Sequence, residues 1–381
     1  MVSLSPSPIQ SEQDQQAVVW LEAFLTSALT DAASDIHFEP FEQVLRVRVR
    51  IDGQLHERPP PSAHLKDRII SRIKVLSRMD ISEKRLAQDG RLRVTLQNIQ
   101  VDMRVSSLPT LHGEKIVLRI QALSSQHLDL QELGYESTQL HDLKKALQQP
   151  NGLVLITGPT GSGKTITLYS CLHYLNATQI NISTVEDPCE IVLPGINQIN
   201  VNEKAGLGFA QTLRALLRQD PDVLMVGEIR DSETADIAVK AAQTGHLVLS
   251  TLHTNDAPST LTRLHQLGVA DFNIASSVIL ICAQRLVRKL CPHCKSHTKE
   301  EQRYKPVGCH FCNNGYKGRV AIHQVMPITS SLQSRMMSSL DMLSLSEHIQ
   351  QSGVLTLRQA GLLKASAGVT SHEEVWAATS V

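Results

Sequence analysis

The chain has 381 residues, which is enough for two or three domains that each bury their own core. Its 37 Lys and Arg residues balance its 37 Asp and Glu residues, so no global field attracts nucleic acid or anionic lipid. The aromatic content of 3% also disfavours a base-stacking surface for single-stranded nucleic acid. No segment approaches the roughly 18 uncharged apolar residues of a spanning helix, and no signal sequence opens the chain, so we predict an intracellular protein without membrane insertion.

Residues 1–123 predict a leader followed by a small α/β domain. The Ser-, Gln- and Pro-rich residues 1–16 predict a disordered leader. The domain over residues 17–123 starts with a predicted helix over 17–32 and a strand over 45–51, where Arg alternates with Val and Asp52-Gly53 supplies a turn. A further helix and three strands complete it, over residues 63–79, 91–96, 100–106 and 111–119.

A Ser-, Gln- and Asp-rich segment after residue 123 interrupts the regular pattern and predicts a linker over residues 124–137. A larger α/β domain over residues 138–381 follows it. We expect this domain to include a Cys-rich insert over residues 288–320 and helices over residues 330–381.

A glycine-rich loop lies between a predicted strand over residues 152–157 and a predicted helix that follows Thr165. In this order, backbone N–H groups close around a β-phosphate, Lys164 reaches the β- and γ-phosphates, and the Thr165 hydroxyl is free to hold Mg²⁺. We therefore predict a site for ATP or GTP. The loop consists of Gly158, Pro159, Thr160, Gly161, Ser162, Gly163, Lys164 and Thr165.

Acidic residues follow two further apolar strands, which we predict over residues 182–185 and 223–226. Because ligands bind outside the carboxyl ends of parallel strands, these residues are expected to face the phosphate loop. The second strand ends in Gly227-Glu228 without the usual aspartate, so we expect Glu228 to hold Mg²⁺ through a water molecule. Glu190 is the predicted residue that orients the attacking water. The alternative for both glutamates is a structural role at a turn.

A third predicted strand, over residues 246–251, leads into Leu252-His253-Thr254-Asn255. A polar cluster directly after an apolar strand fits a γ-phosphate sensor, in which His253 donates to the phosphate and reports its loss. A single histidine is more often structural, and this alternative stays open.

The seven cysteines favour reduced thiols or a metal site over a disulfide framework. Four of them form two C-x-x-C pairs separated by fourteen residues. Four thiolates at this spacing can close a tetrahedron around Zn²⁺ with no open position, so we predict a structural zinc site, with a redox dithiol as the alternative. The predicted ligands are Cys291, Cys294, Cys309 and Cys312, and the predicted core thiols are Cys171, Cys189 and Cys282.

These segments resemble the type II secretion and type IV pilus assembly ATPase family. The resemblance covers roughly residues 20–330 in the family's order, which makes it more specific than any single motif. The matching segments are 158–165, 184–188, 220–222, 227–231, 244–246 and 252–255 in the larger domain, and 33–40, 48–53, 83–90 and 112–115 in the smaller one.

The resemblance implies a hexameric ring of RecA-like ATPase domains, each joined by a flexible linker to a PAS-like N-terminal domain. Nucleotide binds where the two domains meet. The resemblance identifies the matching segments as Walker A, aspartate box, Walker B and histidine box, with the key residues Lys164, Thr165, Glu190, Glu228 and His253.

Two arginines of the smaller domain are also assigned by the resemblance. Arg104 and Arg119 match family arginines that reach the phosphates from the N-terminal domain. A guanidinium that arrives on domain closure would stabilise transition-state charge and couple hydrolysis to movement. The alternative is that both are ordinary surface arginines.

The function implied by the resemblance is a cytoplasmic motor, bound at the inner membrane through a platform protein, that hydrolyses ATP to assemble a type IV pilus or a type II secretion pseudopilus. The cysteine pairs favour extension or export, because retraction motors generally lack such a metal hairpin. The alternatives are a pilus retraction ATPase, a RecA-like nucleic-acid motor and an inert regulatory subunit. The neutral charge balance and scarce aromatics disfavour the nucleic-acid motor, and the intact acidic residues disfavour the inert subunit.

Three features depart from the family's pattern. Family members usually carry a further N-terminal domain, whereas this chain begins almost directly at the second one, so it is either shortened or recruited to the membrane differently. Cys189 stands beside Glu190 where a branched aliphatic residue is usual, which predicts a site sensitive to oxidation. Gln324 follows His323 where the family commonly has glutamate.

Overall fold

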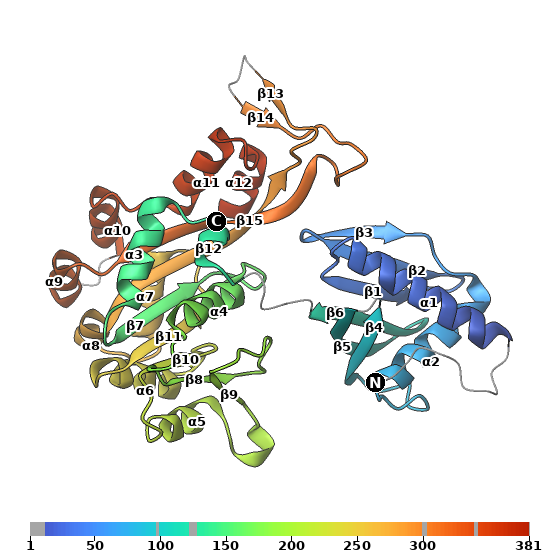
Figure 1. Ribbon diagram of the computed structural model, residues 1–381, viewed down its shortest axis with the longest axis horizontal. Helices are drawn as coiled ribbons and strands as arrows, with labels where there is room; N and C mark the ends of the chain where they lie inside the picture. Colours follow the sequence, from blue (N-terminus) through green and yellow to red (C-terminus); the bar gives the residue numbers. More distant parts are fainter. Residues whose placement is uncertain (1–11, 97–98, 122–127, 299–302, 339–341, 381) are drawn as a thin grey trace. The chain divides into compact units, whose positions relative to one another are not determined.

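The computed structural model describes residues 12–96, 99–121, 128–298, 303–338 and 342–380 (Figure 1). The chain divides at residue 123 into two compact units. A six-stranded sheet forms the centre of the first unit and a seven-stranded sheet forms the centre of the second. Within the described ranges, no helix combines the length and the apolar character needed to cross a bilayer.

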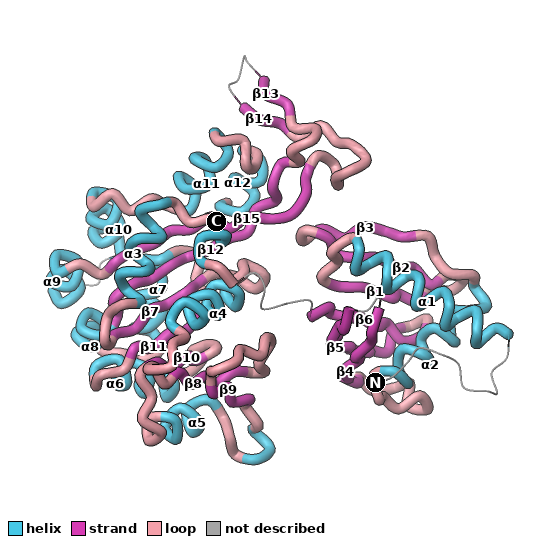
Figure 2. Tube along the Cα trace, viewed as in Figure 1, coloured by secondary structure: helices cyan, strands magenta, loops and turns pink. Residues whose placement is uncertain are grey.

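The first unit is an antiparallel sheet with the strand order β3-β2-β1-β6-β5-β4 (Figure 2). Two helices share one hydrophobic core with one face of this sheet. The strands are β1 (Asp35–Pro40), β2 (Leu45–Ile51), β3 (Gln54–Arg58), β4 (Gln88–Leu96), β5 (Ile99–Thr110) and β6 (Gly113–Gln121), and the helices are α1 (Glu12–Thr30), η1 (Ala63–Leu65) and α2 (Lys66–Leu76).

Helix α1 begins earlier than the sequence pattern predicts. Residues 12–16, which we expected to belong to a disordered leader, form its first turns, and Asp14 pairs with Arg68 of α2. This long-range ion pair and the burial of Ala17 and Val18 fix the start of the helix, and neither was visible in the Gln-rich composition. Residues 1–11 of the predicted leader lie outside the described residues.

Strand β2 shows the predicted alternation, because its apolar side chains are buried and its arginines lie on the other face. Arg46 and Arg48 donate to Glu39 of β1 at 3.0 and 2.8 Å. Burial opposes ionisation of Glu39, but the hydrogen bonds from Arg48 and Lys115 hold its pKa at about 2. One carboxylate therefore offsets part of the basic charge on this face.

A buried ion pair ties the loop after α2 to the β5–β6 hairpin. Lys74 Nζ donates to Glu114 Oε1 at 2.6 Å and to the Glu83 carbonyl oxygen at 2.7 Å, and the Ser107 hydroxyl donates to the same carboxylate at 2.9 Å. The two charged side chains are only 1% and 5% exposed. Removal of either partner would leave an uncompensated buried charge.

The second unit has the strand order β15-β12-β7-β11-β10-β8-β9, with all neighbours parallel except the antiparallel pair β12–β15. The strands of this sheet are β7 (Gly152–Thr157), β8 (Ile182–Glu186), β9 (Asn197–Asn200), β10 (Val223–Val226), β11 (Leu247–Leu252), β12 (Val278–Leu290) and β15 (Tyr316–Pro327). The helices are η3 (Leu130–Leu133), α3 (Ser137–Leu147), α4 (Lys164–Leu175), η4 (Glu203–Ala205), α5 (Phe209–Leu216), α6 (Ser232–Gln243), α7 (Ala257–Gln266), α8 (Asp271–Ser277), α9 (Ser330–Ser338), α10 (Met342–Gln351), α11 (Leu357–Ser366) and α12 (His372–Thr379).

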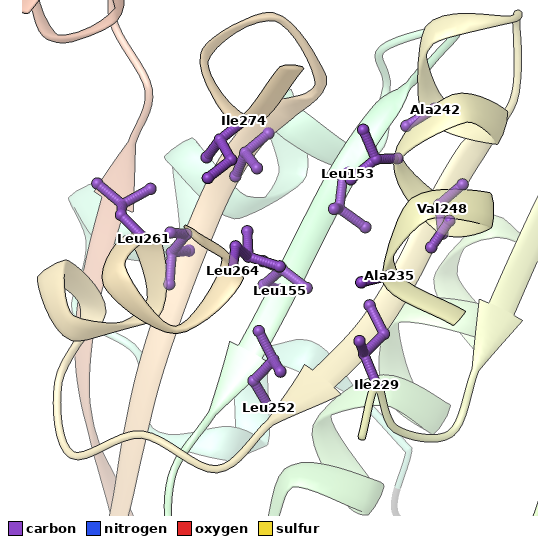
Figure 3. Packing of buried hydrophobic residues seen from close by; sticks show 14 of the residues in the cluster. Leu153, Leu155, Ile229, Ala235, Ala242, Val248, Leu252, Leu261, Leu264 and Ile274 are labelled. Atoms are coloured by element: carbon purple, nitrogen blue, oxygen red, sulfur yellow. The ribbon is translucent and has the colours of Figure 1, made fainter. Parts of the chain in front are cut away.

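Helices cover both faces of this sheet. Leu153 and Leu155 of β7 pack against α6, α7 and α8 on one face, and Val154 and Ile156 pack against α3 and α4 on the other. This arrangement explains why residues 153–156 are all apolar, since each of them is buried on one side of the sheet or the other. Figure 3 shows the first of these cores around Leu153, Leu155, Ile229, Ala235, Ala242, Val248, Leu252, Leu261, Leu264 and Ile274.

The Cys-rich insert lies at the tip of the long β12–β15 ribbon, with β13 (Ser296–Thr298) and β14 (Arg303–Lys305) within it (Figure 1). Its base is bonded to the turn between α11 and α12. Leu290 N donates to the Val369 carbonyl oxygen at 2.9 Å, and Lys295 Nζ donates to the Gly368 carbonyl oxygen at 2.7 Å. The insert is therefore attached to the rest of the unit through hydrogen bonds as well as through the chain.

The predicted linker over residues 124–137 is wrong from residue 128 onward. Leu128 and Leu130 are buried in the core of the second unit, and η3 follows directly. Leu128, Leu130 and Leu133 attach this segment to the core, although its Ser- and Gln-rich composition is typical of a linker. Residues 122–127 lie outside the described residues.

His323 of β15 is fully buried and stacks on Tyr135, with 3.7 Å between ring centroids. Neither ring nitrogen has a hydrogen-bond partner among the residues described. Burial, with the charge of Lys364, lowers the pKa of His323 to about 3. The imidazole is therefore neutral in the folded protein throughout the physiological range.

This burial predicts a loss of stability in acid. The unfolded chain protonates an imidazole below about pH 6.5, whereas the folded protein does not. The contribution of His323 to the free energy of unfolding is therefore fully present above that pH and falls by about 1.4 kcal/mol per pH unit below it. His323→Phe, which keeps a ring on Tyr135, should remove this slope. Urea unfolding from pH 7 to 4.5, followed by Trp376 fluorescence in a Trp20→Phe background, measures it. Parallel pH curves for His323→Phe and the parent would contradict the prediction, whereas the exposed His141→Phe should give a parallel curve.

Candidate active site

The phosphate loop follows β7 and opens α4, as the sequence predicts. Gly158, Gly161 and Gly163 have φ angles of +149°, +81° and +90°. A Cβ on Gly158 would lie 2.5 Å from the Gln284 carbonyl oxygen and 2.6 Å from Ser162 Oγ, distances that real Cβ atoms do not show. At Gly158 the close approach of β12 therefore requires glycine, for its φ angle as well as for space.

Donors at the start of α4 are open to an anion. The helix has Gly163 at its N-cap with no side-chain cap, so its first-turn N–H groups are left to an external acceptor. The Ser162 hydroxyl is buried and lacks a hydrogen-bond partner within the described ranges. An orphaned hydroxyl beside uncapped N–H groups fits a phosphate.

Lys164 lies beside this loop with its ammonium group on the loop carbonyls. Its Nζ donates to the carbonyl oxygens of Gly158 at 2.7 Å and Pro159 at 3.2 Å. Burial and the charge of Arg285 lower the pKa of Lys164 to about 8, although the Glu228 carboxylate opposes the shift. The ammonium group is thus in a setting where a phosphate oxygen would relieve part of its desolvation.

Glu228 and His253 come together at the same sheet edge, at the ends of β10 and β11. His253 Nε2 lies 3.6 Å from Glu228 Oε2, and Arg230 contacts the other carboxylate oxygen. Burial alone would raise the pKa of Glu228, but the hydrogen bond and charge of Arg230, with the charges of His253 and Lys164, hold it below its usual value. Burial and the charge of Lys164 lower the pKa of His253.

The segment after β8 is organised by Tyr169 of α4. The Tyr169 hydroxyl donates to Glu186 and accepts from the Glu190 N–H at 3.0 Å. Glu186 is buried and also accepts from Thr184 Oγ1 at 2.6 Å, so it anchors the loop from within. Glu190 is exposed, and the contacts described tie its main chain to α4.

Cys189 lies in the same loop, with its Sγ accepting from Gln198 Nε2 at 3.0 Å. Burial and the charge of Glu186 raise the pKa of the Cys189 thiol. Because the thiolate is the form that oxidises readily, this environment argues against the predicted sensitivity to oxidation.

Three residues of the site were missed from the sequence. Thr157, the last residue of β7, receives a hydrogen bond from the Thr254 N–H at 3.0 Å, and Gln284 and Arg285 of β12 bond to the loops on either side. None carries a motif of its own. Thr157 ends a buried strand, a position from which only acidic residues were selected. Gln284 and Arg285 lie within β12, where the sequence gives no such signal.

Arg104 and Arg119 belong to the first unit, where they are direct partners on β5 and β6. Arg119 Nε donates to Asp35 Oδ1 at 3.0 Å, and 68% of its side chain is exposed. Arg104 Nη2 is buried and has no hydrogen-bond partner in the part of the chain described. The sheet thus brings the two arginines together, and their role toward the phosphates stays a prediction.

The four cysteines of the insert converge. The ligand atoms of Cys291, Cys294, Cys309 and Cys312 all lie within 4.8 Å of one another. Four sulfur atoms this close, from two C-x-x-C turns, match the donor set of a closed tetrahedral zinc site. The residues therefore fit Zn²⁺.

Comparison with known proteins agrees with this geometry. The family model described as Type II/IV secretion system protein matches residues 10–377. Among relatives, the type IV pilus assembly ATPase PilB of Pseudomonas aeruginosa is 51% identical, over 96% of this chain and 68% of its own length. The type II secretion system ATPase E of Vibrio cholerae is 44% identical, over 97% of this chain and 77% of its own length.

Solved structures share the fold. The ATPase DotB of Legionella pneumophila has a TM-score of 0.72 at 21% identity, covering 98% of this chain and 97% of its own. The pilus retraction motor PilT, solved with bound ADP, has a TM-score of 0.66 at 24% identity, covering 95% of this chain and 97% of its own. At these identities the likeness shows the fold alone.

The predicted α/β fold class is confirmed, with two α/β units and a small insert that gathers four cysteines. The predicted family is confirmed as well, because a family model matches almost the whole chain and two relatives exceed 40% identity. The chain belongs to the type II/IV secretion system protein family.

Proposed function

We propose that this chain is an ATPase motor that hydrolyses ATP to assemble a type IV pilus or a type II secretion pseudopilus. The observation that carries the proposal is the convergence of Lys164, Glu228 and His253 beside an uncapped phosphate loop. The pilus assembly and secretion relatives support the process that is driven.

In the proposed mechanism, the N–H groups of residues 158–165 bind the phosphates and Lys164 neutralises charge on the β- and γ-phosphates. The Thr165 hydroxyl and the Glu228 carboxylate are the oxygen groups that would hold Mg²⁺. When bound, Mg²⁺ would stabilise the charge that develops on the transferred phosphoryl group.

Glu190 is our candidate for the residue that orients the attacking water, and Glu228 is the alternative general base. Glu190 is exposed, and its main-chain N–H donates to the Tyr169 hydroxyl of α4, which fixes the backbone of the loop there. Glu228 is held as a carboxylate by Arg230, His253 and Lys164, which favours a charge-stabilising role for it. His253 would donate to the γ-phosphate and report its loss.

We further propose a homo-hexamer in which Arg104 and Arg119 reach the phosphates from the N-terminal domain. Their in-register pairing supports an anion ligand for this pair, as does Arg104 Nη2, which has no hydrogen-bond partner among the residues that the structure describes. A guanidinium delivered by domain movement would make hydrolysis depend on that movement.

Zn²⁺ would be held by the four insert cysteines in a structural role, since four sulfurs leave no open position. This insert supports the extension or export direction, and a retraction motor is the alternative. We also propose a cytoplasmic location, with attachment to the inner membrane through a platform protein.

Lys164→Ala and Glu228→Ala should each lower the rate of ATP hydrolysis by about 100-fold or more, because each removes charge stabilisation from the phosphoryl group. Lys145→Ala, at an exposed position of α3, is a matched control that should keep the parent rate. The assay is run with and without single-stranded DNA. Parent activity equal to that of the variants would indicate an inert subunit, and turnover stimulated by DNA would indicate a nucleic-acid motor.

Gly158→Ala should weaken ATP binding by about 10-fold or more, because its Cβ would force the loop away from β12 or from Ser162. Gly161→Ala is the matched comparison: its φ is +81°, and nothing lies within 4 Å of its Cβ position. It should cost less, through backbone strain alone. Isothermal titration with a non-hydrolysable ATP analogue measures both affinities. An equal or larger loss in Gly161→Ala would contradict the crowding argument.

Cys309→Ser should abolish the zinc content and loosen the insert, since three thiolates no longer close the site. Elemental analysis measures the metal. Fluorescence of Trp376 in a Trp20→Phe background reports the insert, because Arg303 lies 5.7 Å from its ring centroid. His293→Ala, beside the cysteines but not among the proposed ligands, should keep one zinc. Full zinc content in Cys309→Ser would show that the ligand set is different.

A further inference from the structure

Strand β12 runs past the end of its neighbour β7 at the phosphate loop. Ala283 of β12 pairs with Thr157, the last residue of β7. Gln284 and Arg285 therefore extend beyond β7 and lie beside the loop that follows it. Since consecutive side chains of a strand point to opposite faces, these two residues reach different parts of the site.

Gln284 holds the phosphate loop. Its Nε2 donates to the Ser162 carbonyl oxygen at 2.8 Å, and its Oε1 accepts from Thr167 Oγ1 at 2.7 Å. A Cβ on Gly163 would lie 2.8 Å from the same Nε2. The side-chain amide thus binds both the loop and the first turns of α4.

Arg285 holds the loop that follows β11. Its Nη2 donates to the Asn255 carbonyl oxygen at 2.7 Å and to Asn255 Oδ1 at 3.3 Å, and its Nη1 donates to the Gln284 carbonyl oxygen at 3.2 Å. The residue is only 8% exposed, and burial lowers its pKa. All three acceptors are neutral, so the guanidinium is buried without an ion pair among these contacts.

The loop bound by Arg285 carries His253. On its other side, the Thr254 hydroxyl is 2.5 Å from Thr157 Oγ1 and 2.8 Å from Thr260 Oγ1. With Thr254 bonded to β7 and Asn255 bonded to β12, the main chain on the C-terminal side of His253 is fixed. The imidazole itself is 51% exposed and lies 3.6 Å from Glu228.

We propose that Arg285 is a positioning residue for ATP hydrolysis, which fixes the loop after β11 so that His253 is directed toward the γ-phosphate. The inference rests on the proposed ATPase function. Because Gln284 on the same strand fixes the phosphate loop, β12 sets the positions of both loops around the nucleotide. The two residues therefore have separable effects, with Gln284 acting on binding and Arg285 on turnover.

Turnover measurements test this assignment. Arg285→Gln should lower kcat by about 10- to 100-fold, because a displacement of about 1 Å at a reacting group has effects of this size. The KM for ATP should change less than about threefold, since the phosphate loop keeps Gln284. Arg285→Lys should recover part of kcat. Gln284→Ala should instead raise KM, and Arg358→Gln on α11 is the control that should match the parent.

A double-mutant cycle separates positioning from simple support of the fold. In a His253→Ala background, Arg285→Gln should lower kcat by less than about twofold, because its effect passes through His253. Additive losses in kcat, or a parallel loss of thermal stability that accounts for them, would overturn the proposal.

Hydrogen exchange gives a test that does not depend on hydrolysis. The amides of residues 254–256 should exchange faster in Arg285→Gln than in the parent, and those of the phosphate loop should not. Unchanged exchange at residues 254–256 would overturn the positioning role even in an active enzyme. If the parent has no ATPase activity, or if Lys164→Ala leaves its rate unchanged, the proposed function is wrong. The exchange measurement then still shows whether Arg285 fixes the loop at residues 254–256.

Discussion

The close approach of β12 to the phosphate loop is the constraint on which the rest of the site depends. There is no space for a side chain at Gly158, because the main-chain carbonyl oxygen of Gln284 lies against it. The side-chain amide of Gln284 donates to the Ser162 carbonyl oxygen of the same loop. In the resulting loop conformation, the first N–H groups of α4 have no side-chain cap, and Ser162 Oγ is buried without a hydrogen-bond partner among the residues described. An anion is the natural ligand for such a surface.

Opposite charges lie close together around the loop, and Glu228 is paired with Arg230. Lys164 is partly desolvated, with its pKa lowered to about 8, while Glu228 is kept ionised by Arg230, His253 and Lys164. A triphosphate with Mg²⁺ would bring both signs of charge into this setting, where fixed groups interact more strongly than they do in water. In the proposed motor, this coupling would make the loop positions sensitive to the loss of one phosphate.

Features set by the order and spacing of neighbouring residues could be predicted from the sequence. Features that depend on contacts between residues far apart in the chain could not. Lys164, Glu228 and the four insert cysteines could be proposed as site residues because the order of strand, loop and helix and the spacing of ligands are visible along the chain. Gln284, Arg285 and the buried pair Lys74–Glu114 could not, because their partners lie 122, 30 and 40 residues away. The early start of α1 and the burial of Leu128 were missed for the same reason, since polar composition hid a few anchoring contacts.

The most direct test is a structure of the full chain with Mg²⁺ and a non-hydrolysable ATP analogue. The account predicts phosphates bound to the N–H groups of residues 158–165, with the γ-phosphate within hydrogen-bond distance of the His253 imidazole and Asn255 still bound to Arg285. An analogue bound elsewhere on the chain, or bound to the loop with His253 turned away from the γ-phosphate, would contradict it.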